Sequence, residues 1–177
     1  MTKKRMTQIV VSVLILAVIV GIWFVKHDEP AATTTGDYAL MLDTATYETL
    51  LTKGKPVMID FGASWCGPCQ AMKPDLIDAN ENYAGKAYVK YVDVDDSAAF
   101  AAGFPISAVP TQVFFEADGT PYQPSETMNI PFAKYAYKDT GEHALTVHEG
   151  LLTAEEIEAN RTNAIKYIQE AQHYNQN

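Results

Sequence analysis

The sequence predicts an α/β domain in which helices flank a mixed sheet. Short runs of β-forming residues alternate along the chain with segments of helical periodicity. The 177 residues are enough for one domain with appendages, and a hydrophobic share of 47% suits a packed core. The charged share of 20% is too low for an intrinsically disordered chain. We therefore expect one domain with the order strand, helix, strand, helix, strand, strand, helix.

Residues 9–25 are predicted to form a transmembrane helix that precedes this domain. They contain no charged side chain, and as a helix they would be about 26 Å long, near the thickness of the hydrocarbon core. Trp23 and Phe24 lie near the end of the run, which is typical of an anchor at the membrane interface. The alternative is a signal peptide cleaved near Ala31 or Ala32, although the apolar core of such peptides is usually shorter.

The distribution of charge gives this anchor an expected orientation. Three basic residues lie in the N-terminal tip, residues 1–8, whereas residues 26–177 hold 10 basic and 22 acidic side chains, a net charge of -12. The positive-inside rule then places the tip in the cytoplasm and the rest on the extracytoplasmic side of a bacterial membrane. We expect a linker over residues 26–36 and the folded domain over 37–177. The overall net charge of -9 argues against nucleic acid as a partner.

The first predicted elements of the domain are a short helix and a buried strand. Residues 44–52 are expected to be helical, because Tyr47, Leu50 and Leu51 share one helical face. A glycine and a proline follow and end this helix. The compact apolar run at 57–61, VMIDF, has the length and composition of a buried strand.

The middle of the domain continues the alternation. A helix is predicted over residues 68–83, where Pro74 can introduce a kink. Residues 87–94 are rich in β-forming side chains and predict a strand. A short helix is expected over 97–102, and a further strand over 111–115.

The last part of the domain contains an apparent insertion. We expect residues 144–148 to form the last strand and residues 122–142 to be a partly extended insertion before it. Thr153 and Glu156 have the spacing of a capping box and predict the start of the last helix. Two interpretations of the insertion stay open: a surface elaboration that packs on its own domain, or a docking element for a partner. Its candidate aromatic anchors are Phe132, Tyr135 and Tyr137.

The two cysteines of the chain, Cys66 and Cys69, form a C-x-x-C pair at the expected start of a helix. Unpaired N–H groups at a helix N-terminus lower the pKa of a nearby thiol, so Cys66 is the predicted thiolate. Cys69 lies one turn further and can attack a mixed disulfide formed by Cys66. Pro68 fits the first helical turn because it needs no N–H partner there. The pattern predicts thiol–disulfide exchange.

Three other uses of a cysteine pair have less support in the sequence. A zinc site would need two more ligands from the four histidines or from carboxylates, and no spacing indicates them. Covalent haem attachment needs a histidine directly after Cys69, where Gln70 stands. A purely structural disulfide would close so small a loop that it constrains little of the unfolded chain. We therefore expect neither a metal nor a cofactor.

The residues around the pair resemble those of the thioredoxin family. The matching segments are VMIDFGASWCGPC, Pro74, Gly85–Lys86, the VDVD run at 92–95, AVPT at 108–111 and Gly150. The resemblance implies a thioredoxin-like fold in which Cys66 attacks and Cys69 resolves. It also implies that Pro110 is a cis-proline that holds substrate backbone and keeps metals away; the alternative is an ordinary proline at the start of a strand. The residues expected to shape the site are Trp65, Gly67, Pro68, Lys90, Val109 and Pro110.

Asp60 is the expected general base. An acid inside the apolar run VMIDF should be buried, where desolvation raises its pKa; the alternative is an aspartate that faces solvent at a sheet edge. By the resemblance, the matching acid takes the proton of the resolving cysteine, and Lys90 occupies the position of a lysine that approaches it. The chain departs from the family at two positions. Gly62 replaces a large aromatic residue, which opens space beside the site, and Gln70 replaces a lysine, which removes a positive charge.

The expected function is that of an extracytoplasmic thiol–disulfide oxidoreductase that reduces protein disulfides through Cys66 and Cys69. The CGPC sequence and Asp60 resemble those of the reducing members of the family. Expected partners are protein disulfide substrates and a membrane electron donor of the thiol-carrier type. One alternative is a disulfide-forming oxidase, and another is a binding or adaptor module that uses the insertion at 122–142.

Overall fold

The computed structural model of the chain describes residues 15–16, 34–125 and 129–159. The chain divides into two units, Met1–Ala31 and Ala32–Asn177, and the elements below belong to the second. Among the described residues, no helix is long and apolar enough to cross a membrane. The predicted cytoplasmic tip lies outside the described residues, as do nearly all of the predicted anchor and most of the predicted linker.

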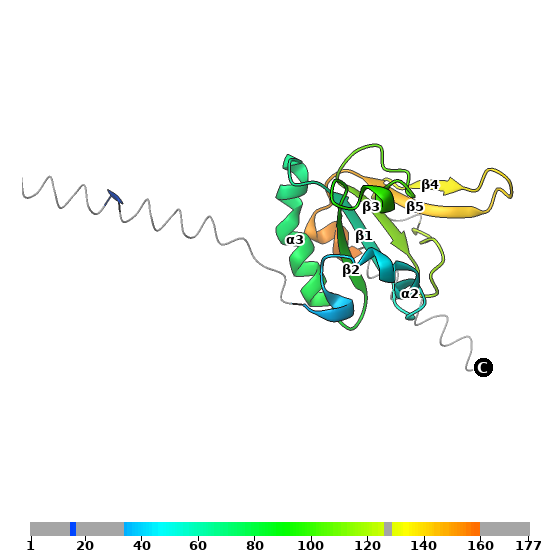
Figure 1. Ribbon diagram of the computed structural model, residues 1–177, viewed down its shortest axis with the longest axis horizontal. Coiled ribbons are helices and arrows are strands. Elements are labelled where there is room, and N and C mark those ends of the chain that lie inside the picture. The colour runs from blue at the N-terminus through cyan, green and yellow to red at the C-terminus, as the bar shows by residue number, and fades with distance from the viewer. Residues whose placement is uncertain (1–14, 17–33, 126–128, 160–177) are drawn as a thin grey trace, which may run out of the picture. The chain divides into compact units, whose positions relative to one another are not determined.

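A five-stranded mixed sheet forms the centre of the described domain (Figure 1). The strand order is β2-β1-β3-β5-β4. β1 and β2 are parallel, whereas β3 is antiparallel to β1, and β5 is antiparallel to both β3 and β4. The strands are β1 (Val57–Gly62), β2 (Tyr88–Asp93), β3 (Thr111–Phe115), β4 (Ala133–Ala136) and β5 (His143–Glu149). This arrangement confirms the predicted mixed sheet and its flanking helices.

β1 is an interior strand, and all six of its residues are buried. The apolar run VMIDF therefore has the buried-strand character that its composition predicts, and Gly62 extends the strand by one residue. Successive side chains of a strand point to opposite faces, so Met58, Asp60 and Gly62 share one face and Val57, Ile59 and Phe61 share the other. This alternation determines which of these residues can reach the cysteines.

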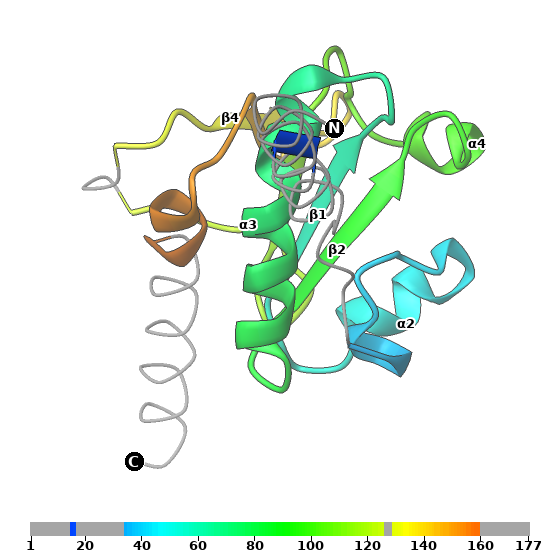
Figure 2. The ribbon, with the colours of Figure 1, turned by 90° about the vertical axis from the view of Figure 1, so that its left-hand side faces the viewer.

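Helices cover both faces of the sheet. Figure 2 shows α3 (Gly67–Tyr83) on one side of β1 and β2, with α2 (Tyr47–Leu51) and α4 (Ala98–Ala101) on the other. On the α3 side, Met72 and Leu76 pack with Met58 and other sheet residues. On the α2 side, Leu50 packs with Ile59 in a second core. Two 3-10 turns, Gly36–Tyr38 and Thr44–Thr46, precede α2.

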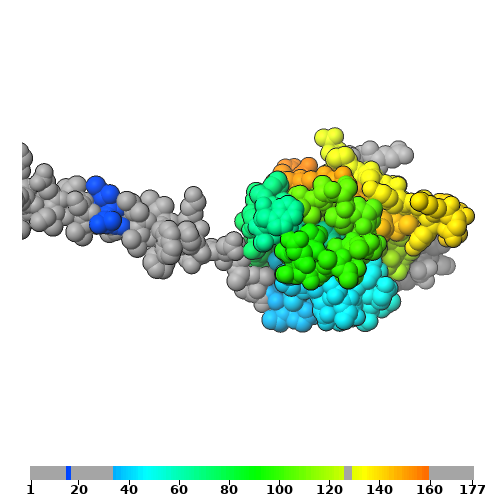
Figure 3. All heavy atoms as spheres, turned by 45° about the horizontal axis from the view of Figure 1, so that its top comes forward, coloured from blue at the N-terminus to red at the C-terminus, as the bar shows by residue number. Residues whose placement is uncertain are grey.

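The predicted insertion is partly core and partly exposed. The ring of Phe132 lies 5.6 Å from that of Phe114 and 5.9 Å from that of Tyr122, so this part packs on its own domain. β4 adds an edge strand to the sheet, and all four of its residues are exposed. Tyr135 and Tyr137 are 37% and 58% exposed, on a β4–β5 hairpin that lies at the surface (yellow in Figure 3). Phe132 is therefore an anchor on this domain, whereas the two tyrosines remain accessible.

The last described helix begins with the predicted capping box. The backbone N–H of Thr153 donates to Glu156 Oε2 at 2.8 Å, and the backbone N–H of Glu156 donates to Thr153 Oγ1 at 3.3 Å. Helical residues follow at 154–159, and Ile157 packs into the core on the α3 side.

Candidate active site

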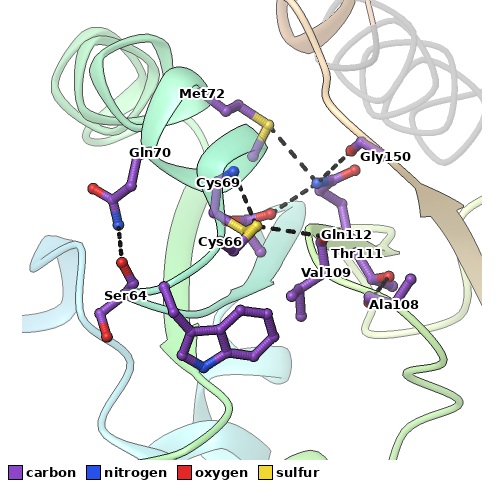
Figure 4. The surroundings of a disulfide bond; sticks show 12 residues. Ser64, Cys66, Cys69, Gln70, Met72, Ala108, Val109, Thr111, Gln112 and Gly150 are labelled. Carbon is purple, nitrogen blue, oxygen red and sulfur yellow. Dashed lines mark hydrogen bonds between the residues drawn. A yellow bond between two sulfur atoms is a disulfide. The ribbon is translucent and has the colours of Figure 1, made fainter.

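Cys66 and Cys69 lie at the point where β1 leads into α3, and a disulfide joins them with their Cα atoms 5.2 Å apart (Figure 4). Cys66 is the N-cap of α3, in extended conformation, and its Sγ accepts a hydrogen bond from the backbone N–H of Cys69 at 3.1 Å. Pro68 occupies the first turn, where its missing N–H leaves no donor unpaired. Once the disulfide is reduced, the same N–H can stabilise a Cys66 thiolate.

The loop before β3 lies against the sulfur of Cys66. The carbonyl oxygen of Val109 is 3.5 Å from Cys66 Sγ, and Val109 packs against the two cysteines. The Val109–Pro110 peptide bond is cis, as predicted. Val109 and Pro110 therefore come together with the cysteine pair, from a segment more than 40 residues further along the chain.

An exposed rim surrounds these buried sulfur atoms. Trp65 is 69% exposed, and its indole N–H donates to Asp95 Oδ2 at 2.7 Å. Gly67 and Pro68 are also exposed, whereas Cys66 and Cys69 are buried. A substrate disulfide would meet this rim first, so Trp65, Gly67 and Pro68 are placed where they can contact it.

Asp60 is buried on the side of the sheet that α3 covers. Its exposed fraction is 1%, and Gln112 Nε2 donates to its Oδ1 at 2.8 Å. Burial raises the pKa of Asp60 to about 7, and the hydrogen bond from Gln112 acts in the opposite direction. The alternative of a solvent-facing aspartate is therefore wrong, and Asp60 can gain or lose a proton near neutral pH.

Comparison with known proteins agrees with this geometry. The thioredoxin family model matches residues 38–130, just over half of the chain. The thioredoxin of Alicyclobacillus acidocaldarius is 34% identical over 100 residues, which cover 53% of this chain and 94% of that protein. The chain belongs to the thioredoxin family. With its Cys66–Cys69 pair, this thioredoxin-family protein is a thiol–disulfide oxidoreductase.

Two further thioredoxins are similar to this chain, one in sequence and one in structure. A thioredoxin H-type of Chlamydomonas reinhardtii is 40% identical over 81 residues, covering 43% of this chain and 72% of that protein. The crystal structure of chloroplastic thioredoxin z superposes with a TM-score of 0.50 at 24% identity, covering 71% of this chain and 93% of that chain. This likeness supports the thioredoxin fold.

One position expected from the thioredoxin resemblance is wrong: Lys90 does not approach Asp60. Lys90 pairs in register with Ile59, whereas Tyr91 pairs with Asp60. Since a shift of one residue moves a side chain to the other face of a sheet, Lys90 points to the α2 side. There its Nζ donates to the carbonyl oxygens of Asp37 and Ala39 at 2.6 and 2.5 Å. Lys90 therefore holds the N-terminal part of the domain and takes no part in the site.

The space expected beside Gly62 is also absent. A Cβ atom on Gly62 would lie 2.7 Å from Cε2 of Tyr91, so the tyrosine ring already fills the position that a larger side chain would use. Tyr91 thus takes the place on the α3 side that the thioredoxin resemblance assigned to Lys90. The other departure, Gln70, is exposed and its Nε2 donates to the Ser64 carbonyl at 3.4 Å.

Gln112 is the site residue that the sequence analysis missed. It is fully buried in β3, next to β1, and its register partner there is Asp60. The sequence feature that could have identified it is the lone amide in the apolar strand TQVFF, because a buried amide requires hydrogen-bond partners. In the described part of the chain, no group of His, Cys, Asp and Glu side chains could hold a metal ion.

Proposed function

We propose that this thioredoxin-family protein is a membrane-anchored reductase of protein disulfides that works on the extracytoplasmic side of a bacterial membrane. The observation that carries the reductase proposal is the Cys66–Cys69 pair at the N-terminus of α3, beside the Val109 carbonyl, in a domain that also buries Asp60 on the α3 side of its sheet. The apolar run at 9–25 and the charge distribution around it support the location.

The first step would be attack by the reduced protein on its substrate. The Cys66 thiolate attacks one sulfur of the substrate disulfide, and the substrate S–S bond breaks. A mixed disulfide forms between Cys66 and the substrate, and the other substrate sulfur leaves as a thiolate. The N–H of Cys69, 3.1 Å from Cys66 Sγ, favours the anionic form of the attacking sulfur.

The second step would release the substrate. Asp60 accepts the proton of the Cys69 thiol, and the Cys69 sulfur attacks Sγ of Cys66. The substrate's remaining sulfur leaves as a thiolate while the Cys66–Cys69 disulfide forms, so two electrons have passed from the protein to the substrate. An acid whose pKa is about 7 suits this transfer because it is partly ionised at neutral pH.

The third step would return the protein to its dithiol form. On the extracytoplasmic side, we propose that a dithiol carrier in the membrane reduces the Cys66–Cys69 disulfide by the same exchange, run in reverse. The carrier is oxidised as the protein is reduced, so each cycle moves one electron pair from the carrier to a protein substrate.

A trapping experiment tests the proposed reductase. In Cys69→Ser, no thiol can resolve the mixed disulfide, so we expect substrates to remain bound to Cys66 and to be released by a reductant. The matched control is Cys66→Ser, which should trap far less because Cys69 lies inside the first turn of α3, whereas Cys66 is the N-cap beside the Val109 carbonyl. Equal trapping by the two variants would contradict the assigned roles. No trapping by either would favour the binding or adaptor alternative.

The location is tested separately from the chemistry. Protease added to intact spheroplasts should digest the domain at residues 37–177 and leave a cytoplasmic marker protein intact. Protection of the domain until the membrane is permeabilised would contradict the proposed orientation. Release of the domain from the cells by processing near Ala31 or Ala32 would instead support the signal-peptide alternative.

A further inference from the structure

Gln112 connects the buried acid to the segment that follows β5. Its Nε2 donates to Asp60 Oδ1 at 2.8 Å and to the Gly150 carbonyl at 3.1 Å, and it lies 3.8 Å from Met72 Sδ (Figure 4). Met72 follows Cys69 by three residues, so the two side chains lie on the same face of α3. Gln112 therefore holds Asp60 on the side of the sheet where the resolving cysteine is buried.

These contacts fix which end of the amide faces Asp60. The Gly150 carbonyl can only accept a hydrogen bond, so the NH₂ group of Gln112 must point toward it. The same NH₂ group then donates to Asp60 whether or not the acid carries a proton. A rotated amide would place Oε1 against the Gly150 oxygen, which is unfavourable.

A fixed donor of this kind acts differently on the two forms of Asp60. A hydrogen bond to a carboxylate is stronger than one to a neutral acid, so the donor favours the ionised form. Burial acts the other way and raises the pKa of Asp60 to about 7. Without Gln112, the hydrogen bond that lowers the pKa of Asp60 would be lost. Desolvation would then raise this pKa further, so a smaller fraction of Asp60 would be ionised at neutral pH.

We propose that Gln112 is a positioning residue that holds Asp60 ionised and oriented for accepting the proton of Cys69. The inference rests on the proposed role of Asp60 as general base. It adds a third side chain to the exchange reaction, supplied by β3 and tied through Gly150 to the segment that follows β5.

Few other titratable groups of the described chain face Asp60. From β2 the facing group is Tyr91, and burial raises its pKa to about 12, so it stays neutral across the relevant range. On α3, Cys69 lies on the buried face of the helix that also includes Met72. From β5, His148 is the register partner of Gln112, and its Nδ1 is 2.9 Å from the Pro131 carbonyl. Lys90 lies on the opposite face of the sheet.

The variant that tests the proposal is Gln112→Met, which keeps the side-chain length and removes the donor. Gln112 Oε1 is buried without a hydrogen-bond partner among the described residues, so methionine also removes a desolvated polar atom. Gln112→Leu serves the same purpose if the methionine variant does not fold. The matched control is Asn80→Leu, which removes another buried amide whose Nδ2 donates to two carbonyls, of Tyr38 and Val89.

The direct measurement is a ¹³C NMR titration of the Asp60 carboxyl in the oxidised full chain, assigned by its absence in Asp60→Asn. In Gln112→Met we expect the midpoint to move upward by about one pH unit. In Asn80→Leu and in His148→Asn it should stay in place. An unchanged midpoint in folded Gln112→Met would overturn the proposal.

A second measurement follows single-turnover oxidation of the reduced full chain by a peptide disulfide between pH 5 and 9. The oxidation rate of Gln112→Met should be about fivefold lower than that of the unaltered protein at pH 7 and nearly equal to it at pH 9. A base whose pKa is one unit higher is largely protonated at pH 7 but largely ionised at pH 9. An equal loss at both pH values would mean a merely structural role and would overturn the proposal.

The two measurements separate this inference from the function on which it rests. If Asp60→Asn exchanges disulfides at the unaltered rate, the general-base role fails, whatever the titration in Gln112→Met shows. If Asp60→Asn is slow at pH 7 but Gln112→Met leaves both the titration and the rate profile unchanged, only the role of Gln112 fails.

Discussion

The two faces of the central sheet differ in the hydrogen-bond partners of their buried ionisable side chains. On the α2 side, Lys90 directs its ammonium group at two carbonyl oxygens and serves the structure of the domain. On the α3 side, Asp60 is as deeply buried but has one side-chain donor, from Gln112. Burial lowers the pKa of Lys90 to about 8 and raises that of Asp60 to about 7. The α3 side, where the buried ionisable group has fewer hydrogen-bond partners, is also the side of the two cysteines.

The largest expected effect concerns the cost of burying Asp60. The folded protein holds this acid at a pKa of about 7, whereas the unfolded chain ionises it near 3.8. The unfolded state therefore releases its proton at lower pH than the folded state does. The stabilisation that comes from holding this proton is fully present only below the unfolded pKa of 3.8, and it is lost as the pH rises through about 7. Relative to Asp60→Asn, the free energy of unfolding of the unaltered protein should fall by about 4 kcal/mol between pH 4 and pH 8.

Urea denaturation of the oxidised proteins across this pH range measures the difference. Asp78→Asn, at an exposed position of α3, is the control and should follow the unaltered protein. Parallel stability curves for Asp60→Asn and the unaltered protein would mean that Asp60 is not held protonated by burial.

The next effect tests the other face. Lys90→Met removes the donor from the carbonyl groups of Asp37 and Ala39 and should lower the free energy of unfolding by about 1 kcal/mol. Its rate of disulfide exchange at pH 7 should stay within about twofold of the unaltered rate, because Lys90 lies on the face away from the cysteines. A loss of exchange rate as large as that of Asp60→Asn would show that Lys90 acts in the reaction and would contradict the different roles of the two faces.

A further effect on stability, of about the same size, tests the packing of Tyr91 beside the site. Gly62→Ala places a methyl group 2.7 Å from Tyr91 Cε2 and should cost about 1 kcal/mol of stability, because the ring must shift. Adding Tyr91→Leu should recover most of that loss, and a double-mutant cycle measures the coupling. Additive losses in the cycle would show that the tyrosine ring does not fill the space beside Gly62.

Local patterns were enough to predict the reactive parts of the molecule. The apolar run around Asp60 predicted its burial, and the C-x-x-C pair with Pro68 predicted two cysteines at the start of a helix. The partners of these residues could not be predicted in the same way. Placing Tyr91 rather than Lys90 opposite Asp60 requires the register of β1 and β2, in which a slip of one residue exchanges the two faces.

Long-range packing accounts for the other differences. The contact between Gln112 and Asp60 depends on the pairing of β3 with β1, across 52 positions of sequence. The ring of Tyr91 over Gly62 depends on the same kind of distant contact. Within the insertion, composition identified the aromatic residues, but only the folded sheet separates the packed Phe132 from the exposed Tyr137.

The reduction potential of the Cys66–Cys69 pair tests the central proposal most directly. The full chain is equilibrated with glutathione buffers of known ratio, and the free thiols are trapped by alkylation and counted by mass. A reductase should give a potential near that of thioredoxins, about -270 mV, so that the dithiol passes electrons to substrate disulfides. A value near about -120 mV, typical of a strong periplasmic oxidant, would contradict the reductase and favour the disulfide-forming oxidase.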